Sequence, residues 1–191
     1  MMSIAPRPST TPAAPDQFKV RFETSKGPIV IEVHRDWAPN GVDRFHQLVQ
    51  EGYYNDVRFF RVVPGFVVQF GMHGDPATNA KWAAQQLPDD PVTQPNKRGT
   101  VTFAKTTMPN SRTTQLFINL QDNTAALNPP SQQGFAPFGE VVEGMSVVDR
   151  LYSGYGDTPT RQQGEIAAEG NAFLNRTYPK LDYVKTVKVV K

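Results

Sequence analysis

The sequence predicts a mostly β protein, arranged as a closed antiparallel β-barrel with two helices. Short runs that alternate apolar and polar residues recur along the chain, and glycine- or proline-rich turns separate them. Only two segments have the apolar spacing of a helix. Many short strands with few helices are typical of antiparallel proteins, and closing the sheet is the most economical way to remove exposed strand edges.

We expect the chain to divide into a disordered, proline-rich leader at residues 1–16 and one folded domain at residues 17–191. The leader places four prolines among Ser, Thr and Ala: Pro6, Pro8, Pro12 and Pro15. A segment of this composition cannot bury enough apolar surface to fold. The remaining length suits one compact domain with a substantial core.

Alternating residues at the two ends of the domain predict three strands. Residues 18–24 and 29–33 form the first hairpin, with Gly27 and Pro28 at its turn. Residues 184–189 alternate in the same way and predict the closing strand.

The first helix is predicted to begin at Pro39 and to end at Gly52. Its apolar residues recur on one face: Val42, Phe45, Leu48 and Val49. Residues 57–69 follow as two strands around a corner at Pro64 and Gly65.

The second half of the domain is predicted to resume β structure after a long surface excursion. Residues 71–98 contain no apolar period and predict a loop, with a short helical turn near residues 81–84. The strands expected beyond it, and the second helix, cover residues 100–104, 115–120, 138–142 and 145–152.

The composition argues against several classes of function. Lys and Arg total 20 against 18 acidic residues, and no dense basic run predicts a nucleic-acid partner. Cysteine is absent, so thiolate chemistry is excluded. No apolar run reaches the roughly 18 residues of a membrane span, so no membrane partner is expected.

Nothing in the sequence suggests a dimer, and we expect a monomer. We expect it in the cytoplasm, or in the bacterial periplasm or outside the cell if a signal peptide was removed.

The histidines predict neither a metal site nor a hydrolytic triad. His34, His46 and His73 are scattered, and the pair formed by His73 and Asp75 has no third ligand nearby in the sequence. Ser111 lacks the surroundings of a nucleophile elbow. No metal and no cofactor are therefore expected.

The run at residues 59–69 is the most informative segment, because it is apolar apart from Arg61 and Gln69. Burying a guanidinium without a partner is costly, so Arg61 needs a polar partner or a ligand. An arginine that extends out of a barrel wall into solvent is the alternative for this segment taken alone.

Four segments in order resemble the cyclophilins, a family of peptidyl-prolyl cis–trans isomerases. Residues 59–69 are similar to the family's F-x-R-[VI]-[VI]-P-G-F-x-x-Q signature. Residues 99–104, 114–118 and 138–145 are similar to its G-x-[VIL]-x-[MF]-A, S-Q-F-F-I and F-G-x-V-x-x-G-M blocks. The resemblance implies an eight-stranded antiparallel barrel capped by two α-helices, acting on unfolded or flexible proline-containing polypeptides.

The resemblance also implies roles for individual residues. Arg61 matches the catalytic arginine, and Gln69 matches the glutamine that orients it. Positions that match the substrate-binding groove are Phe66, Val67, Ala104, Lys105, Phe117, Ala126, Leu127 and Phe135.

Two of these positions depart from the common family pattern. Phe135 stands where many members have histidine, and Ala126 stands where many have tryptophan or phenylalanine. Because that second aromatic contacts cyclosporin in the family, we expect weak binding of the drug. The departures also keep open a second function, a non-catalytic prolyl-peptide-binding or chaperone-like module on the same fold.

Overall fold

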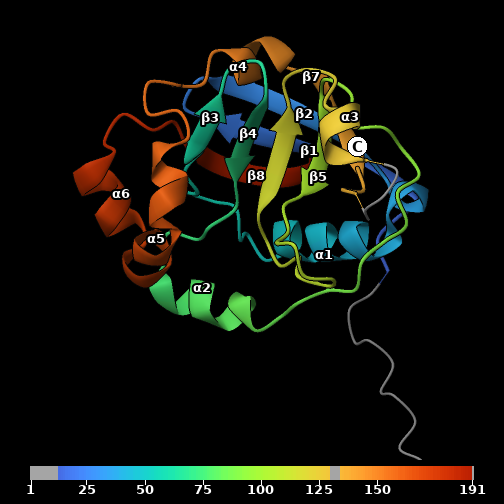
Figure 1. The fold of residues 1–191 in the computed structure, drawn as a ribbon, viewed down its shortest axis with the longest axis horizontal. Helices are drawn as coiled ribbons and strands as arrows, with labels where there is room; N and C mark the ends of the chain where they lie inside the picture. Colours follow the sequence, from blue (N-terminus) through green and yellow to red (C-terminus); the bar gives the residue numbers. More distant parts are fainter. Residues whose placement is uncertain (1–12, 130–133, 191) are drawn as a thin grey trace, which may run out of the picture.

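The computed structural model describes residues 13–129 and 134–190, which form one eight-stranded antiparallel sheet with helices around it (Figure 1). The strand order is β3-β4-β6-β5-β7-β2-β1-β8. The strands are β1 Gln17–Thr24, β2 Gly27–His34, β3 Arg61–Val63, β4 Val67–Phe70, β5 Thr100–Phe103, β6 Leu116–Asn119, β7 Gly139–Glu143 and β8 Val184–Val190. Every predicted strand region is thus confirmed as β structure, although the first continuous ladder within residues 57–69 begins only at Arg61.

The prediction of a closed barrel was wrong, because the sheet is open and curled. β3 and β8 are its two ends, and no ladder joins them within the described residues. The chain ahead of β3 meets the start of β8 through one isolated bridge, Arg58 to Tyr183, and the Phe59 N–H donates to the Asp182 carbonyl at 2.9 Å. β3 is only three residues long, so too little extended chain faces β8 to close the sheet.

The prediction of only two helices was also wrong. The described residues contain α1 Pro39–Gln50, α2 Pro76–Ala83, α3 Thr124–Leu127, α4 Met145–Asp149, α5 Gln163–Glu169 and α6 Asn171–Thr177, with 3₁₀ turns at Arg35–Trp37 and Thr158–Gln162. α1 and α4 are the two that the apolar spacing predicted. Of the others, α2 overlaps the short helical turn predicted near residues 81–84, and α3, α5 and α6 have at most seven residues.

Two apolar clusters hold the fold together. The main core fills the curl of the sheet, where Phe22, Phe45 and Phe70 are almost fully buried, and Phe45 lies on α1. In Figure 1, α4 lies above the strands and α1 lies below them. A second cluster joins Phe60 and Met72 to the side chains of α5 and α6, namely Ile166, Phe173 and Leu174. Each Å² of apolar surface that is buried stabilises the fold by about 25 cal/mol, and this contribution holds α5 and α6 beside β3 and β4.

The start of the described chain contacts the domain. Ala14 is buried, its N–H donates to Asp43 Oδ1 at 2.9 Å, and the Asp16 carbonyl accepts from the Arg35 N–H. The rest of the predicted leader, residues 1–12, lies outside the described residues. Within the described chain, no helix combines the length and the apolar character that a membrane span requires.

Candidate active site

Four side chains form a row across neighbouring strands at one end of the sheet. Arg61 on β3 lies opposite Gln69 on β4, Gln69 lies opposite Phe117 on β6, and Phe117 lies opposite Thr102 on β5. Directly opposite residues of antiparallel strands share a face of the sheet. The register therefore brings the predicted catalytic pair and the predicted apolar floor together, although Phe117 is distant from the pair in sequence.

The Arg61 guanidinium is fixed on two sides and open on a third. Its Nη1 donates to Gln69 Oε1 at 3.1 Å, and its Nε donates to Asp157 Oδ1 at 2.6 Å. The guanidinium carbon lies 5.6 Å from the centre of the Phe66 ring. Within the described chain, Nη2 makes no hydrogen bond, and 23% of the side chain is exposed. Arg61 therefore holds a fixed geometry while keeping donor capacity for a bound ligand.

The Gln69 amide that contacts Arg61 is itself held in place. Gln69 is buried, and its Nε2 donates to Gln115 Oε1 at 2.8 Å. Gln115 Nε2 in turn lies 3.4 Å from Oε1 of Gln163, the first residue of α5. The chain of amides leaves Gln69 Oε1 as the acceptor that faces Arg61. The three glutamines also line a cavity of about 240 Å³. The other residues that line it are Ala104, Lys105, Thr106, Ser111 and Thr113.

Phe117 and Phe135 form an apolar corner beside this row. Phe117 is buried, and the two rings meet edge to face with centroids 5.4 Å apart. Lys105 Nζ lies 5.4 Å from the centre of the Phe135 ring. Phe135 and Lys105 also border a larger cavity of about 610 Å³, completed by Asp89, Thr106, Thr107, Met108 and Pro109. Phe135 therefore provides a wall but offers no hydrogen-bond donor from its side chain.

A buried network of asparagines fixes the backbone of both walls. Asn123 Nδ2 donates to the Phe66 carbonyl at 2.9 Å and to Asn119 Oδ1 at 2.8 Å. Asn119 Nδ2 donates to Asn96 Oδ1, and Asn96 Nδ2 donates to the Phe135 carbonyl at 3.0 Å. The three asparagines are at most 3% exposed, so each missing bond would leave a costly unpaired group. The network therefore fixes the position of Phe66 relative to Phe135.

The remaining predicted groove residues differ in how deeply they are buried and in their contacts with these walls. Val67 is buried opposite Asn119, and the Ala104 N–H donates to the Gln115 carbonyl. Leu127 is half-buried, and its carbonyl accepts from the Phe135 N–H at 3.3 Å. Ala126 is exposed on α3, and its N–H donates to the Asn123 carbonyl at 3.1 Å.

Sequence reasoning missed three residues of the site. Gln115 could have been predicted, because it belongs to a segment that carries the family resemblance. Asp157 and Gln163 come from the turn and helix whose fold the sequence did not predict. Asp157 is 96 positions from Arg61 along the chain, and no local pattern marks it as a partner. Within the described residues, the group of side chains able to hold a metal lies elsewhere, at Glu32, His34 and Glu140.

Comparison with known proteins agrees with this geometry. The sequence model of the family described as "Cyclophilin type peptidyl-prolyl cis-trans isomerase/CLD" matches residues 19–169. The chain is 38% identical over 170 residues to "Peptidyl-prolyl cis-trans isomerase B" of Escherichia coli, covering 86% of this chain and 94% of that protein. It is 36% identical over 135 residues to a "Peptidyl-prolyl cis-trans isomerase" of Acinetobacter baylyi, covering 69% and 70%.

Solved structures show the same fold at low sequence identity. A cyclophilin-type isomerase of Cryptosporidium parvum, crystallised in the presence of the dipeptide Ala-Pro, has a TM-score of 0.63 and 18% identity, covering 91% of this chain and 99% of that one. A cyclophilin of Hirschia baltica has a TM-score of 0.60 and 17% identity, covering 93% and 75%. At these identities the likeness concerns the fold alone.

Proposed function

Because this chain belongs to the family of cyclophilin-type peptidyl-prolyl cis–trans isomerases, we propose that it catalyses rotation about X-Pro bonds and that Arg61 is the catalytic donor. The observation that carries the assignment is the row of Arg61, Gln69 and Phe117 on one face of the sheet. It places a polarised donor next to an apolar surface suited to a proline ring.

The chemistry requires a weakening of amide resonance. The partial double bond of the imide gives a rotation barrier of about 18–20 kcal/mol. A donor close to the imide nitrogen localises the lone pair on that atom, and this interaction is strongest when the bond is twisted. Each tenfold acceleration requires about 1.36 kcal/mol of such preferential stabilisation. The reaction breaks no covalent bond, so it needs no nucleophile and no general base.

The contacts of Arg61 support this role. Nη1 and Nε are engaged by Gln69 and Asp157, which limits the rotation of the guanidinium, while Nη2 is available. A pre-oriented donor loses little entropy when the substrate twists, so more of its interaction energy appears in the rate. Gln69 acts on the reaction mainly through Arg61, and Asp157 is a second positioning residue.

The apolar residues account for binding. We assign the proline ring to the surface formed by Phe66, Phe117 and Leu127, with Val67 beneath it and Phe135 as a wall. The backbone of Ala104 and Lys105 forms the edge that receives the residues before proline. The substrates are exposed X-Pro bonds in unfolded or flexible polypeptides, where the ring and the preceding backbone can both be reached.

A direct experiment is two-dimensional exchange NMR at equilibrium on a peptide that contains one Ala-Pro bond. We expect catalytic amounts of the protein to produce cis–trans exchange peaks that the free peptide lacks, since uncatalysed exchange takes roughly 10–100 s. Arg58→Ala is the matched control for Arg61→Ala in this experiment, because this neighbouring arginine pairs with Asp56 and Tyr183 and not with the row of Arg61, Gln69 and Phe117. Peptide binding without exchange peaks would leave only the non-catalytic role.

A further inference from the structure

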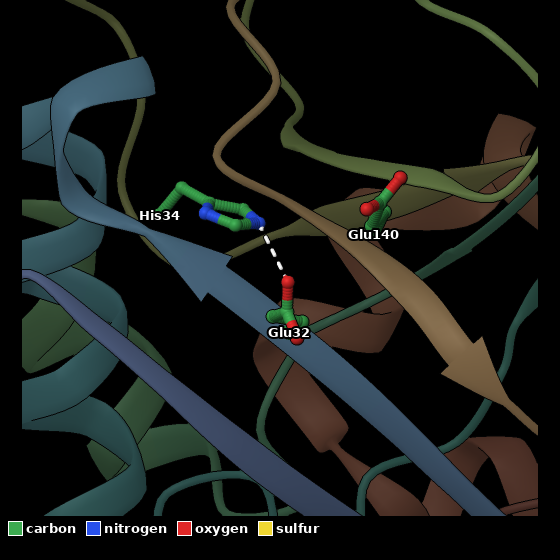
Figure 2. Close-up of side chains that lie close together, drawn as sticks. All are labelled: Glu32, His34 and Glu140. Carbon is green, nitrogen blue, oxygen red and sulfur yellow. Dashed lines mark ion pairs between the residues drawn. The ribbon is translucent and has the colours of Figure 1, made fainter.

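Three side chains with metal-binding atoms converge on a different part of the sheet from the active-site row. Glu32 and His34 are two residues apart on β2 and share a face of that strand, and Glu140 on β7 lies directly opposite Glu32. Their ligand atoms all lie within 4.8 Å of one another. Figure 2 shows the His34 ring directed toward Glu32, with Glu140 approaching from the neighbouring strand.

The histidine ring is held in the orientation that a metal ligand needs. It stacks on Trp37 with centroids 4.3 Å apart and an angle of 21° between the planes. Its Nε2 lies 3.1 Å from Glu32 Oε1, and the side chains of His34 and Glu32 are only 18% and 22% exposed. The stacking on Trp37 restrains the plane of the ring, and the contact with Glu32 directs Nε2 toward the carboxylates.

The two carboxylates lack a permanent cationic partner. Within the described chain, neither Glu32 nor Glu140 forms an ion pair with a lysine or an arginine. Lys19 lies opposite Glu32 on β1, but it is exposed and forms no ion pair with it. Like charges directly opposite each other on neighbouring strands are destabilising. A bound cation would relieve that repulsion.

We propose that Glu32, His34 and Glu140 bind a divalent transition-metal ion of the Zn²⁺ type. One imidazole and two carboxylates suit Zn²⁺ better than Ca²⁺, which takes 6–8 oxygen ligands. Zn–N and Zn–O bonds of about 2.0–2.2 Å place tetrahedral ligand atoms roughly 3.3 Å apart. The pair of His34 and Glu32 already has nearly this spacing at 3.1 Å. Only Glu140 has to swing inward, and water completes the fourth position.

The site fastens β2 to β7 and does not take part in isomerisation. β2 and β7 pair only from Val30 to Val33, with a register shift between Val30 and Ile31. An ion held by side chains of both strands adds a second link at this short ladder. Because an ion that binds only the folded state stabilises it by mass action, Zn²⁺ raises the unfolding temperature of the chain.

The proposal is tested by titrating the chelator-treated full chain with ZnCl₂ in a calorimeter. We expect one ion per chain with a dissociation constant on the order of micromolar. His34→Gln and Glu140→Gln each weaken binding at least tenfold. His73→Gln is the matched control, because that imidazole also lies near two carboxylates, Asp75 and Asp56, and its removal leaves binding unchanged.

Thermal unfolding and Co²⁺ absorption separate a loss of ligand from a loss of fold. All three variants should melt near the wild-type temperature without metal, but only wild type and His73→Gln should gain stability from ZnCl₂. Visible absorption of bound Co²⁺ should likewise disappear in His34→Gln. Zinc binding that survives in both site variants, or wild-type binding that requires millimolar Zn²⁺, overturns the proposal.

Discussion

The substitution Gln69→Leu tests whether the orientation of Arg61 matters for the rate. It removes the acceptor of Arg61 Nη1 while keeping a similar side-chain volume in a buried position. A hydrogen bond from a charged donor contributes about 1.5–3 kcal/mol. At about 1.36 kcal/mol per decade, its full loss would lower kcat/KM roughly 10- to 160-fold. Because Asp157 still holds Nε, we expect the lower end, about tenfold.

A protease-coupled assay on an Ala-Pro peptide measures the effect, and chemical unfolding measures the stability of the variant. We expect a stability loss under about 1.5 kcal/mol, because Arg61 and Gln115 are partly exposed and can turn to water. Arg58→Ala is the control, since this arginine pairs with Asp56 and Tyr183, leaves the contact between Gln69 and Arg61 intact and should lower kcat/KM less than threefold. A folded Gln69→Leu protein with wild-type kcat/KM would refute the orienting role.

Three further predictions concern charge, pH and inhibition. Asp157→Asn should change the free energy of unfolding by only about 0.2–1 kcal/mol, since the ion pair with Arg61 is partly exposed, and a denaturation curve that shows a larger loss would contradict this. Burial lowers the pKa of His73 against the opposing effect of Asp75 and Asp56, and the neutral Nδ1 accepts the Asp75 N–H. A histidine with a lowered folded-state pKa contributes stability above its unfolded pKa of about 6.5 and loses it as the pH falls below that value. Unfolding measured from pH 7.5 to pH 5 should therefore show falling stability, with a shallower slope in His73→Gln; equal slopes would rule this out. Cyclosporin should inhibit weakly because Ala126 offers no aromatic surface, and a low nanomolar inhibition constant would disprove that expectation.

The sequence was sufficient for the parts of the fold in which pattern and burial coincide. The hairpin of β1 and β2 alternates in sequence because one face fills the core, and α1 is long enough to repeat its apolar face over three turns. The same reasoning failed for α5 and α6. Each has seven residues, and their buried side chains pack on Phe60 and Met72, which lie far away in sequence.

The site shows the same division between local pattern and long-range contact. Arg61 and Gln69 were predictable because both lie in one distinctive segment and pair across one tight turn. Asp157 was not predictable, since its contact with Arg61 depends on how the segment before α5 returns to β3. The three side chains of the proposed metal site were not predictable together, because Glu140 meets Glu32 and His34 only through the pairing of β7 with β2.

The most direct test of the account is the rate of the Arg61→Lys variant beside Arg61→Ala. Lysine keeps the positive charge but lacks the forked N–H groups that engage Gln69 and Asp157 and that, in the proposed mechanism, also reach the substrate. If a positioned donor at the imide nitrogen drives the reaction, kcat/KM should fall at least tenfold in both variants while peptide binding persists. Arg61→Lys with the rate of wild type would show that charge alone suffices, and an undiminished rate in Arg61→Ala would remove Arg61 from the mechanism.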